Sequence, residues 1–124
     1  MIKLLVVDDE IDICDFVKNF FKERNFDVSV AYNGKEALRI MDTVKPQIVL
    51  LDLKMPVMDG METLKRINKS HPEAKVIIVT AVEDTEKAEE AKRHNAAEYI
   101  TKPLFLEQLE RAVMTIAEQI KMGM

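Results

Sequence analysis

The chain has 124 residues, of which 48% are hydrophobic and 32% charged, and its formal net charge is −4. This size and composition exclude a disordered chain and fit one globular domain with its own core. No apolar run approaches the about 20 residues of a membrane helix, and the absence of a basic stripe argues against direct nucleic-acid binding.

The first part of the sequence alternates strand and helix patterns. Residues 4–7 form a continuous apolar run, which is typical of a parallel strand covered on both faces. Helical spacing follows at 10–24, and the alternating residues 27–32 predict a second strand. Asn33 then caps a helix, with Glu36 reaching back to it. The apolar side of the first helix is expected to carry Ile13, Phe16, Val17, Phe20 and Phe21.

The same alternation continues to the end of the chain. Strands are predicted at 48–51, 76–79 and 99–101, and helices at 61–70, 84–94 and 106–120. Asn95 is expected to end the fourth helix in a left-handed conformation. Strict alternation of short strands and helices requires parallel pairing with right-handed crossovers. We therefore expect one doubly wound, three-layer α/β/α domain over residues 1–124, without a linker or repeat.

Polar side chains stand directly after four of the predicted strands. They are Asp8, Asp9, Asp52, Thr80 and Lys102. Because the carboxyl ends of parallel strands open onto one crevice, we expect these side chains to lie together. Clustered carboxylates without histidine or thiol favour Mg²⁺ or Mn²⁺ over zinc. We expect Asp9 and Asp52 to be direct ligands and Asp8 to reach the ion through water.

This set of groups predicts phosphoryl chemistry. Carboxylates with a divalent cation, an ammonium group and a hydroxyl group can together hold a phosphoryl group during transfer. Asp52 can itself be the nucleophile, because carboxylates form acyl phosphates. The structural alternative for Asp8 and Asp9 is capping of the helix that follows them, but capping does not account for Asp52 on another strand.

Four segments, 7–10, 51–60, 79–81 and 99–103, resemble the receiver domain of bacterial two-component response regulators. They occur in the family's order and at suitable spacing, and the match extends from Ile2 to about residue 120. The resemblance implies a flavodoxin-like (CheY-like) fold, with a five-stranded parallel sheet in the order 2-1-3-4-5.

The resemblance also implies a role for each residue of the acidic cluster. Asp52 would be the phosphoacceptor, and Asp8 and Asp9 would form the acidic pocket that binds Mg²⁺. The backbone carbonyl of Lys54 would complete the ligands of the metal.

On the opposite side of the predicted crevice, the resemblance implies a switch. Thr80 and Lys102 would contact phosphoryl oxygens, and a cis peptide would join Lys102 to Pro103. Tyr99 would turn inward when Thr80 is drawn towards the phosphoryl group. The alternative for Tyr99 is ordinary strand packing, since aromatic residues favour strands.

The implied function is that of a signalling protein in the cytoplasm. A sensor histidine kinase or a histidine phosphotransfer protein would donate the phosphoryl group. The face formed by the fourth helix, fifth strand and fifth helix, about residues 84–121, would then act on a partner protein or on an output domain missing from this sequence. The chain would be no enzyme beyond catalysing its own phosphorylation and dephosphorylation. The sole cysteine, Cys14, fits a reducing compartment.

Two enzyme-like or cofactor-binding alternatives use similar elements. A haloacid-dehalogenase-type phosphatase also has an aspartate nucleophile after a strand, but it requires a second aspartate two residues later, where this chain has Lys54. A flavodoxin requires a phosphate-binding loop after its first strand, where the acidic residues 8–10 would repel phosphate.

Overall fold

The structure is a computed structural model that describes residues 1–55, 58–81 and 85–123, apart from the side chain of Thr85. Asp84, the predicted start of the fourth helix, lies outside the described residues, as do positions 56–57 of one family-like segment. Within the described residues, five strands and five helices alternate along the chain, as predicted. The strands are β1 (Lys3–Val7), β2 (Asp27–Ala31), β3 (Ile48–Asp52), β4 (Lys75–Thr80) and β5 (Glu98–Thr101). The helices are α1 (Ile11–Lys22), α2 (Gly34–Thr43), α3 (Gly60–Ser70), α4 (Thr85–Arg93) and α5 (Leu106–Lys121).

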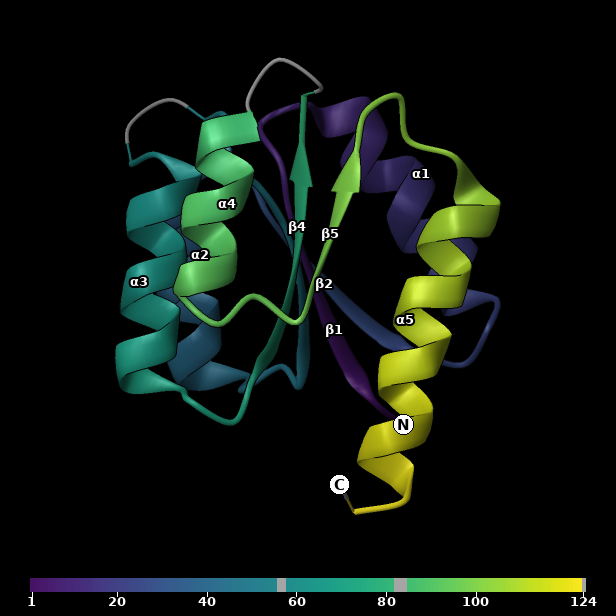
Figure 1. Cartoon of the computed structure of the whole chain (residues 1–124). Helices are drawn as coiled ribbons and strands as arrows, with labels where there is room; N and C mark the ends of the chain where they lie inside the picture. Colours follow the sequence, from purple (N-terminus) through teal and green to yellow (C-terminus); the bar gives the residue numbers. More distant parts are fainter. Residues whose placement is uncertain (56–57, 82–84, 124) are drawn as a thin grey trace.

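The strands form one parallel sheet in the order β2-β1-β3-β4-β5, which confirms the predicted topology. Helices α1 and α5 cover one face of this sheet, and α2, α3 and α4 cover the other (Figure 1). The central strand β3 is buried along its whole length. Burial on both faces explains why its sequence is a continuous apolar run rather than an alternating one.

Each face of the sheet has its own hydrophobic cluster. Leu4, Phe21 and Leu109 belong to the cluster under α1 and α5, whereas Leu51 and Ile67 belong to the cluster under α2, α3 and α4. All five side chains are fully buried. Burial of such a side chain contributes about 1.5–3 kcal/mol, so these two clusters hold the strand ends in fixed positions.

The structure confirms the predicted roles of Asn33 and Asn95 at helix ends. The Asn33 side chain accepts a hydrogen bond of 2.9 Å from the backbone N–H of Glu36, which caps α2. Asn95 has a φ of 68°, as expected of a left-handed residue after α4. Asn25 and Lys45 also have positive φ angles, which were not predicted from the sequence.

Phe16 corrects the prediction for the first helix, because 58% of its surface is exposed. The buried side chains of α1 are Cys14, Val17 and Phe21. They share one stripe at helical spacing, and Phe16 lies about 100° of rotation away from Val17. Among the described helices, none has the length and apolar composition that crossing a bilayer requires.

Candidate functional site

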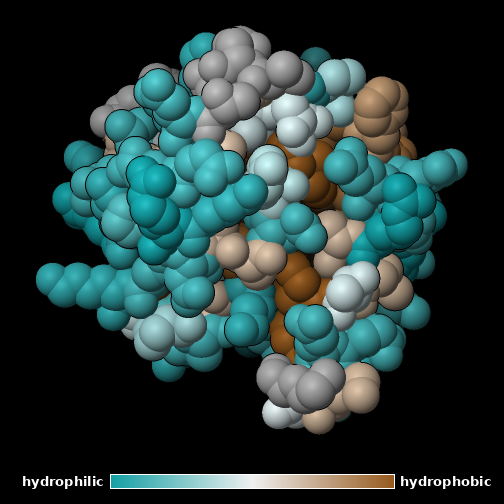
Figure 2. Space-filling view, in the orientation of Figure 1, coloured by the Kyte–Doolittle hydropathy of each residue, from teal (hydrophilic) through white to brown (hydrophobic). Residues whose placement is uncertain are grey.

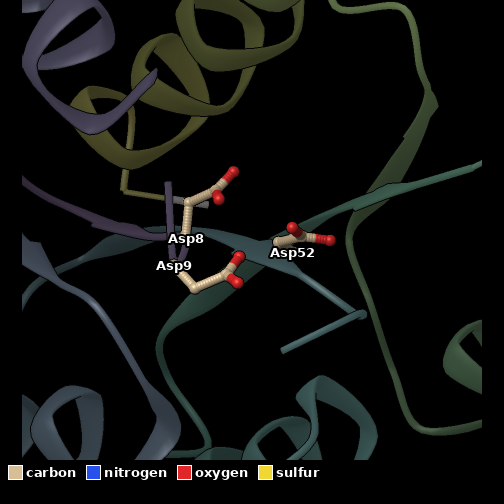
Figure 3. Close-up of side chains that lie close together, drawn as sticks. All are labelled: Asp8, Asp9 and Asp52. Carbon is tan, nitrogen blue, oxygen red and sulfur yellow. The ribbon is translucent and has the colours of Figure 1, made fainter. Parts of the chain in front are cut away.

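The sheet brings the three aspartates together at its carboxyl edge. Val7 of β1 pairs with Leu51 of β3, so the next residues along, Asp8 and Asp52, stand side by side. One carboxylate oxygen from each of Asp8, Asp9 and Asp52 lies within 4.8 Å of those of the other two. Figure 3 shows the three side chains gathered in one region at the ends of the two strands. The predicted acidic cluster is therefore present.

Backbone hydrogen bonds hold two of these carboxylates. Asp8 Oδ1 accepts a bond of 2.9 Å from the N–H of Glu10, and Asp52 Oδ1 accepts one of 3.0 Å from the N–H of Lys54. Asp8 is 5% exposed and Asp52 3% exposed, whereas Asp9 is exposed to solvent. The N-cap residue of α1 is Glu10, and its side chain makes no capping bond. Asp8 thus bonds to the backbone of the N-cap residue itself rather than serving as the N-cap of α1.

Lys102 supplies the ammonium group of the site. Its Nζ donates a hydrogen bond of 3.2 Å to Asp52 Oδ2. Its backbone N–H donates to the Thr80 carbonyl at 2.7 Å, which ties the end of β5 to the end of β4. The peptide bond between Lys102 and Pro103 is cis.

Burial and the neighbouring charges together shift the pKa values of Asp8 and Lys102. Burial, reinforced by the charge of Asp52, raises the pKa of Asp8 to about 6 despite the hydrogen bond from Glu10. Burial is the largest single influence on the pKa of Lys102 and lowers it. The charge of Asp52, the hydrogen bond to Asp52 and the charges of Asp8 and Glu10 together outweigh burial, so the net shift is upward. A cation bound between the carboxylates would relieve the repulsion that raises the pKa of Asp8.

Thr80 and Tyr99 occupy neighbouring positions on the last two strands. Thr80 is 3% exposed, and its hydroxyl has no hydrogen-bond partner among the described residues. In the pairing of β4 with β5, Tyr99 lies beside Ile78. Thr80 is two residues further along β4 than Ile78. Tyr99 is half-buried against the cluster under α2, α3 and α4, and the Lys92 ammonium lies 4.2 Å from the centre of its ring. This last contact was not predicted from the sequence.

Gly60 allows the loop after β3 to return tightly against the strand. Its N–H donates to the Leu53 carbonyl at 2.9 Å. A Cβ atom at this position would lie 2.3 Å from Leu53 Cα and 2.4 Å from the Asp52 carbonyl oxygen. Only glycine therefore fits directly beneath the phosphoacceptor candidate.

Two further features near the acidic cluster were not anticipated from the sequence. The Cys14 thiol donates to the Asp8 carbonyl at 3.3 Å, and burial raises the pKa of this thiol to about 12, which disfavours the reactive thiolate. An apolar cavity of about 230 Å³ opens beside Asp8 and Lys102 and extends towards Val17 and Leu109. Both features depend on how α1 and α5 sit on the sheet, for which single residues carry little signal.

Comparison with known proteins agrees with this geometry. The family profile of the response regulator receiver domain matches residues 4–114. The chemotaxis protein CheY of Listeria monocytogenes serovar 1/2a is 42% identical over 117 residues, which cover 90% of this chain and 98% of that protein. The sporulation initiation phosphotransferase F of Bacillus subtilis (strain 168) is 35% identical, with 90% of both chains covered.

A longer relative and a solved structure extend the comparison. The regulatory protein AtoC of Escherichia coli (strain K12) is 35% identical over 90% of this chain, which spans only 24% of that protein. A crystal structure of a response regulator receiver domain protein from Clostridium thermocellum is 32% identical, with a TM-score of 0.92 and full coverage of both chains.

Proposed function

This chain belongs to the family of response regulator receiver domains, and from this premise we propose that it is a phosphorylation-dependent switch with Asp52 as its phosphoacceptor. One observation carries the assignment. Asp52 is the carboxylate that is both paired with the Lys102 ammonium at 3.2 Å and grouped with two further aspartates. A single carboxylate with a cation on one side and an acidic metal pocket on the other suits phosphoryl transfer.

The proposed metal is Mg²⁺, with Mn²⁺ as a substitute. Asp8, Asp9 and Asp52 would hold it, together with the backbone carbonyl of Lys54. The donor set is made of oxygens, as hard cations prefer. The pKa of Asp8 is raised mainly by burial and further by the charge of Asp52, and a bound cation would offset both effects. When bound, the ion would neutralise charge on the carboxylates and on the incoming phosphoryl oxygens.

In the proposed transfer, an oxygen of the Asp52 carboxylate attacks the phosphorus of a phosphohistidine. The new O–P bond forms as the P–N bond breaks, and the imidazole nitrogen leaves and takes up a proton from solvent. Lys102 is already paired with Asp52 Oδ2 and would pair with a phosphoryl oxygen, to which the Thr80 hydroxyl would donate. Water later hydrolyses the acyl phosphate and releases inorganic phosphate. The chain would thus catalyse only its own phosphorylation and dephosphorylation.

The output of the switch would be the face formed by α4, β5 and α5. The buried hydroxyl of Thr80 has no partner among the described residues, so a phosphoryl oxygen would be a favourable acceptor for it. Tyr99 would move inward as Thr80 moves towards the site. An equilibrium between two states, biased by a local charge, is sufficient for such a response.

The partners follow from the same premise. The donor would be a sensor histidine kinase or a histidine phosphotransfer protein in the cytoplasm, where the unpaired Cys14 is stable as a thiol. Residues 1–124 would work as one receiver domain. Its target would be a separate partner protein or an output domain in the same protein, because relatives of both lengths occur. Direct binding of nucleic acid or membrane by this chain is not part of the proposal.

Labelling with a small phosphodonor tests the assignment. With acetyl phosphate and Mg²⁺, the wild-type chain should gain one acid-labile phosphoryl group, and Asp52→Asn should gain none. Asp59→Asn is the matched control, because Asp59 is an exposed aspartate that caps α3 and asparagine can keep its bond of 2.8 Å to the N–H of Glu62. Undiminished labelling of the Asp52 variant, or labelling independent of divalent cations, would show that the proposed function is wrong.

A further inference from the structure

Helix α4 is held to the rest of the protein by unusually little apolar packing. Of its described side chains, only Ala88 and Ala91 are buried. Figure 2 shows a largely hydrophilic surface on the side where α3 and α4 lie. Small buried side chains stabilise a helix weakly, so individual polar contacts of α4 weigh more in its position than they would elsewhere.

One of these contacts reaches the proposed switch residue. The Lys92 Nζ lies 4.2 Å from the centre of the Tyr99 ring, which is the geometry of a cation–π contact. The same ammonium donates a longer bond of 3.4 Å to Glu89 one turn earlier on α4. The interaction with the Tyr99 side chain also raises the pKa of the Lys92 ammonium. Lys92 therefore remains charged at neutral pH while it faces the ring.

We propose that Lys92 is a positioning residue that holds Tyr99 in its present, half-buried place and thereby opposes the switch. This inference rests on the proposed function of Tyr99. It adds a residue on α4 that sets how readily the switch occurs, through a contact made before phosphorylation.

Inward movement of the Tyr99 ring would separate it from the Lys92 ammonium. The Lys92 side chain is 44% exposed, and Glu89, its second partner, is 62% exposed. An ammonium group that followed the ring into the interior would lose its water and Glu89 together, which is strongly unfavourable. Inward movement of Tyr99 must therefore break the cation–π contact, so the contact favours the resting state.

The affinity for beryllofluoride, a phosphoryl mimic, measures this preference directly. In the presence of Mg²⁺, Lys92→Met should bind beryllofluoride about two- to fivefold more tightly than wild type, the range that an exposed cation–π contact provides. Lys92→Arg keeps a cation over the ring and should restore the wild-type affinity. Lys87→Met is the matched control, because Lys87 is also on α4 but lines a groove with Lys65 and Glu90.

A double-mutant cycle separates this role from a general effect on α4. When Tyr99 is replaced by leucine, the ring is absent, and Lys92→Met should no longer change the affinity for beryllofluoride. A purely structural role of Lys92 in α4 would persist in the leucine background. Persistence of the effect in that background would therefore overturn the proposal.

Fluorine NMR distinguishes failure of this inference from failure of the proposed function. The chain has two tyrosines, so labelling with 3-fluorotyrosine gives two signals, and Tyr32→Phe assigns them. Tyr32 follows β2 at the opposite edge of the sheet from β5 and serves as an internal reference. If beryllofluoride leaves the Tyr99 signal unmoved in the wild type, the proposed switch is wrong. If that signal moves but Lys92→Met binds the mimic no better than Lys87→Met, only the role of Lys92 is wrong.

Discussion

The two sides of the site are held by different kinds of contact. On the acidic side, Asp8 and Asp52 directly follow or end buried strands, and their carboxylates accept backbone hydrogen bonds of 2.9 and 3.0 Å. On the α4 side, the contacts are two buried alanines and pairs of exposed polar groups, such as Lys65 with Glu90 at 3.3 Å. The first side loses hydrophobic burial if it moves, whereas the second loses mainly screened surface contacts.

This difference assigns separate tasks to the two sides. Phosphoryl transfer needs groups fixed within a few tenths of an ångström, which packed strands provide. A conformational response needs an element whose displacement requires little free energy, which α4 provides. The following predictions test whether the acidic side is as rigid, and the α4 side as weakly held, as these contacts indicate.

The largest effect is expected from Gly60→Ala, on the acidic side. The added Cβ would lie 2.3 Å from Leu53 Cα, and this obstacle is backbone that cannot rotate away. We expect the free energy of unfolding to fall by about 3 kcal/mol, the upper end for overpacking, in urea titrations. Gly123→Ala is the control, because its φ of +76° strains alanine but nothing lies within 4 Å of the new atom. Equal losses at both positions would show that the loop beneath Asp52 is not rigid.

The acidic side is also the part that the sequence alone predicted best. Apolar runs mark the strands, and the polar residue that ends or follows each run must lie at the edge of the sheet. Asp8, Asp9 and Asp52 could therefore be grouped from the sequence alone. The order of the strands and the cis peptide before Pro103 came from the family resemblance instead.

The α4 side was predicted less completely, for a physical reason. The contacts Lys92–Tyr99 and Lys65–Glu90 depend on the rotation of α4 about its axis and on long, exposed side chains. Periodicity fixes which face of a helix is apolar, but α4 has few apolar residues from which to read that face. The prediction that Phe16 faces the core was wrong for a similar reason. Five apolar residues of α1 were assigned to one side of the helix, but that side buries only some of them.

The next effect concerns the buried carboxylate of Asp8 on the acidic side. The pKa of Asp8 is raised to about 6 from an ordinary 3.8 by burial, so the folded state binds more protons than the unfolded state between these values. Stability without Mg²⁺ should therefore fall as pH rises from about 4 to 6 and stay low above it. Asp8→Asn keeps the acceptor for the Glu10 N–H and removes the charge.

We expect Asp8→Asn to raise the free energy of unfolding by about 1–3 kcal/mol at pH 7.5 without Mg²⁺, and by much less at pH 4. Urea titrations at both pH values measure this change in the free energy of unfolding. Asp9→Asn, at the exposed neighbour, should give a smaller gain at pH 7.5. If stability does not depend on pH, or if Asp8→Asn lowers the free energy of unfolding, the buried charge of Asp8 does not destabilise the fold.

The smallest effect is expected on the α4 side, from Lys65→Met. The Lys65 Nζ pairs with Glu90 at 3.3 Å and links α3 to α4, but the two side chains are 42% and 37% exposed. Global stability should change by less than about 1 kcal/mol, as for surface ion pairs, while amide hydrogen exchange in α4 should quicken about two- to fivefold. Arg66→Met is the control, because Arg66 pairs with Glu62 inside α3 at 2.9 Å. If exchange in α4 responds equally to both variants, Lys65 does not tether the helix. If Lys65→Met instead lowers global stability by several kcal/mol, α4 belongs to the rigid part of the fold, and the division between the two sides is wrong.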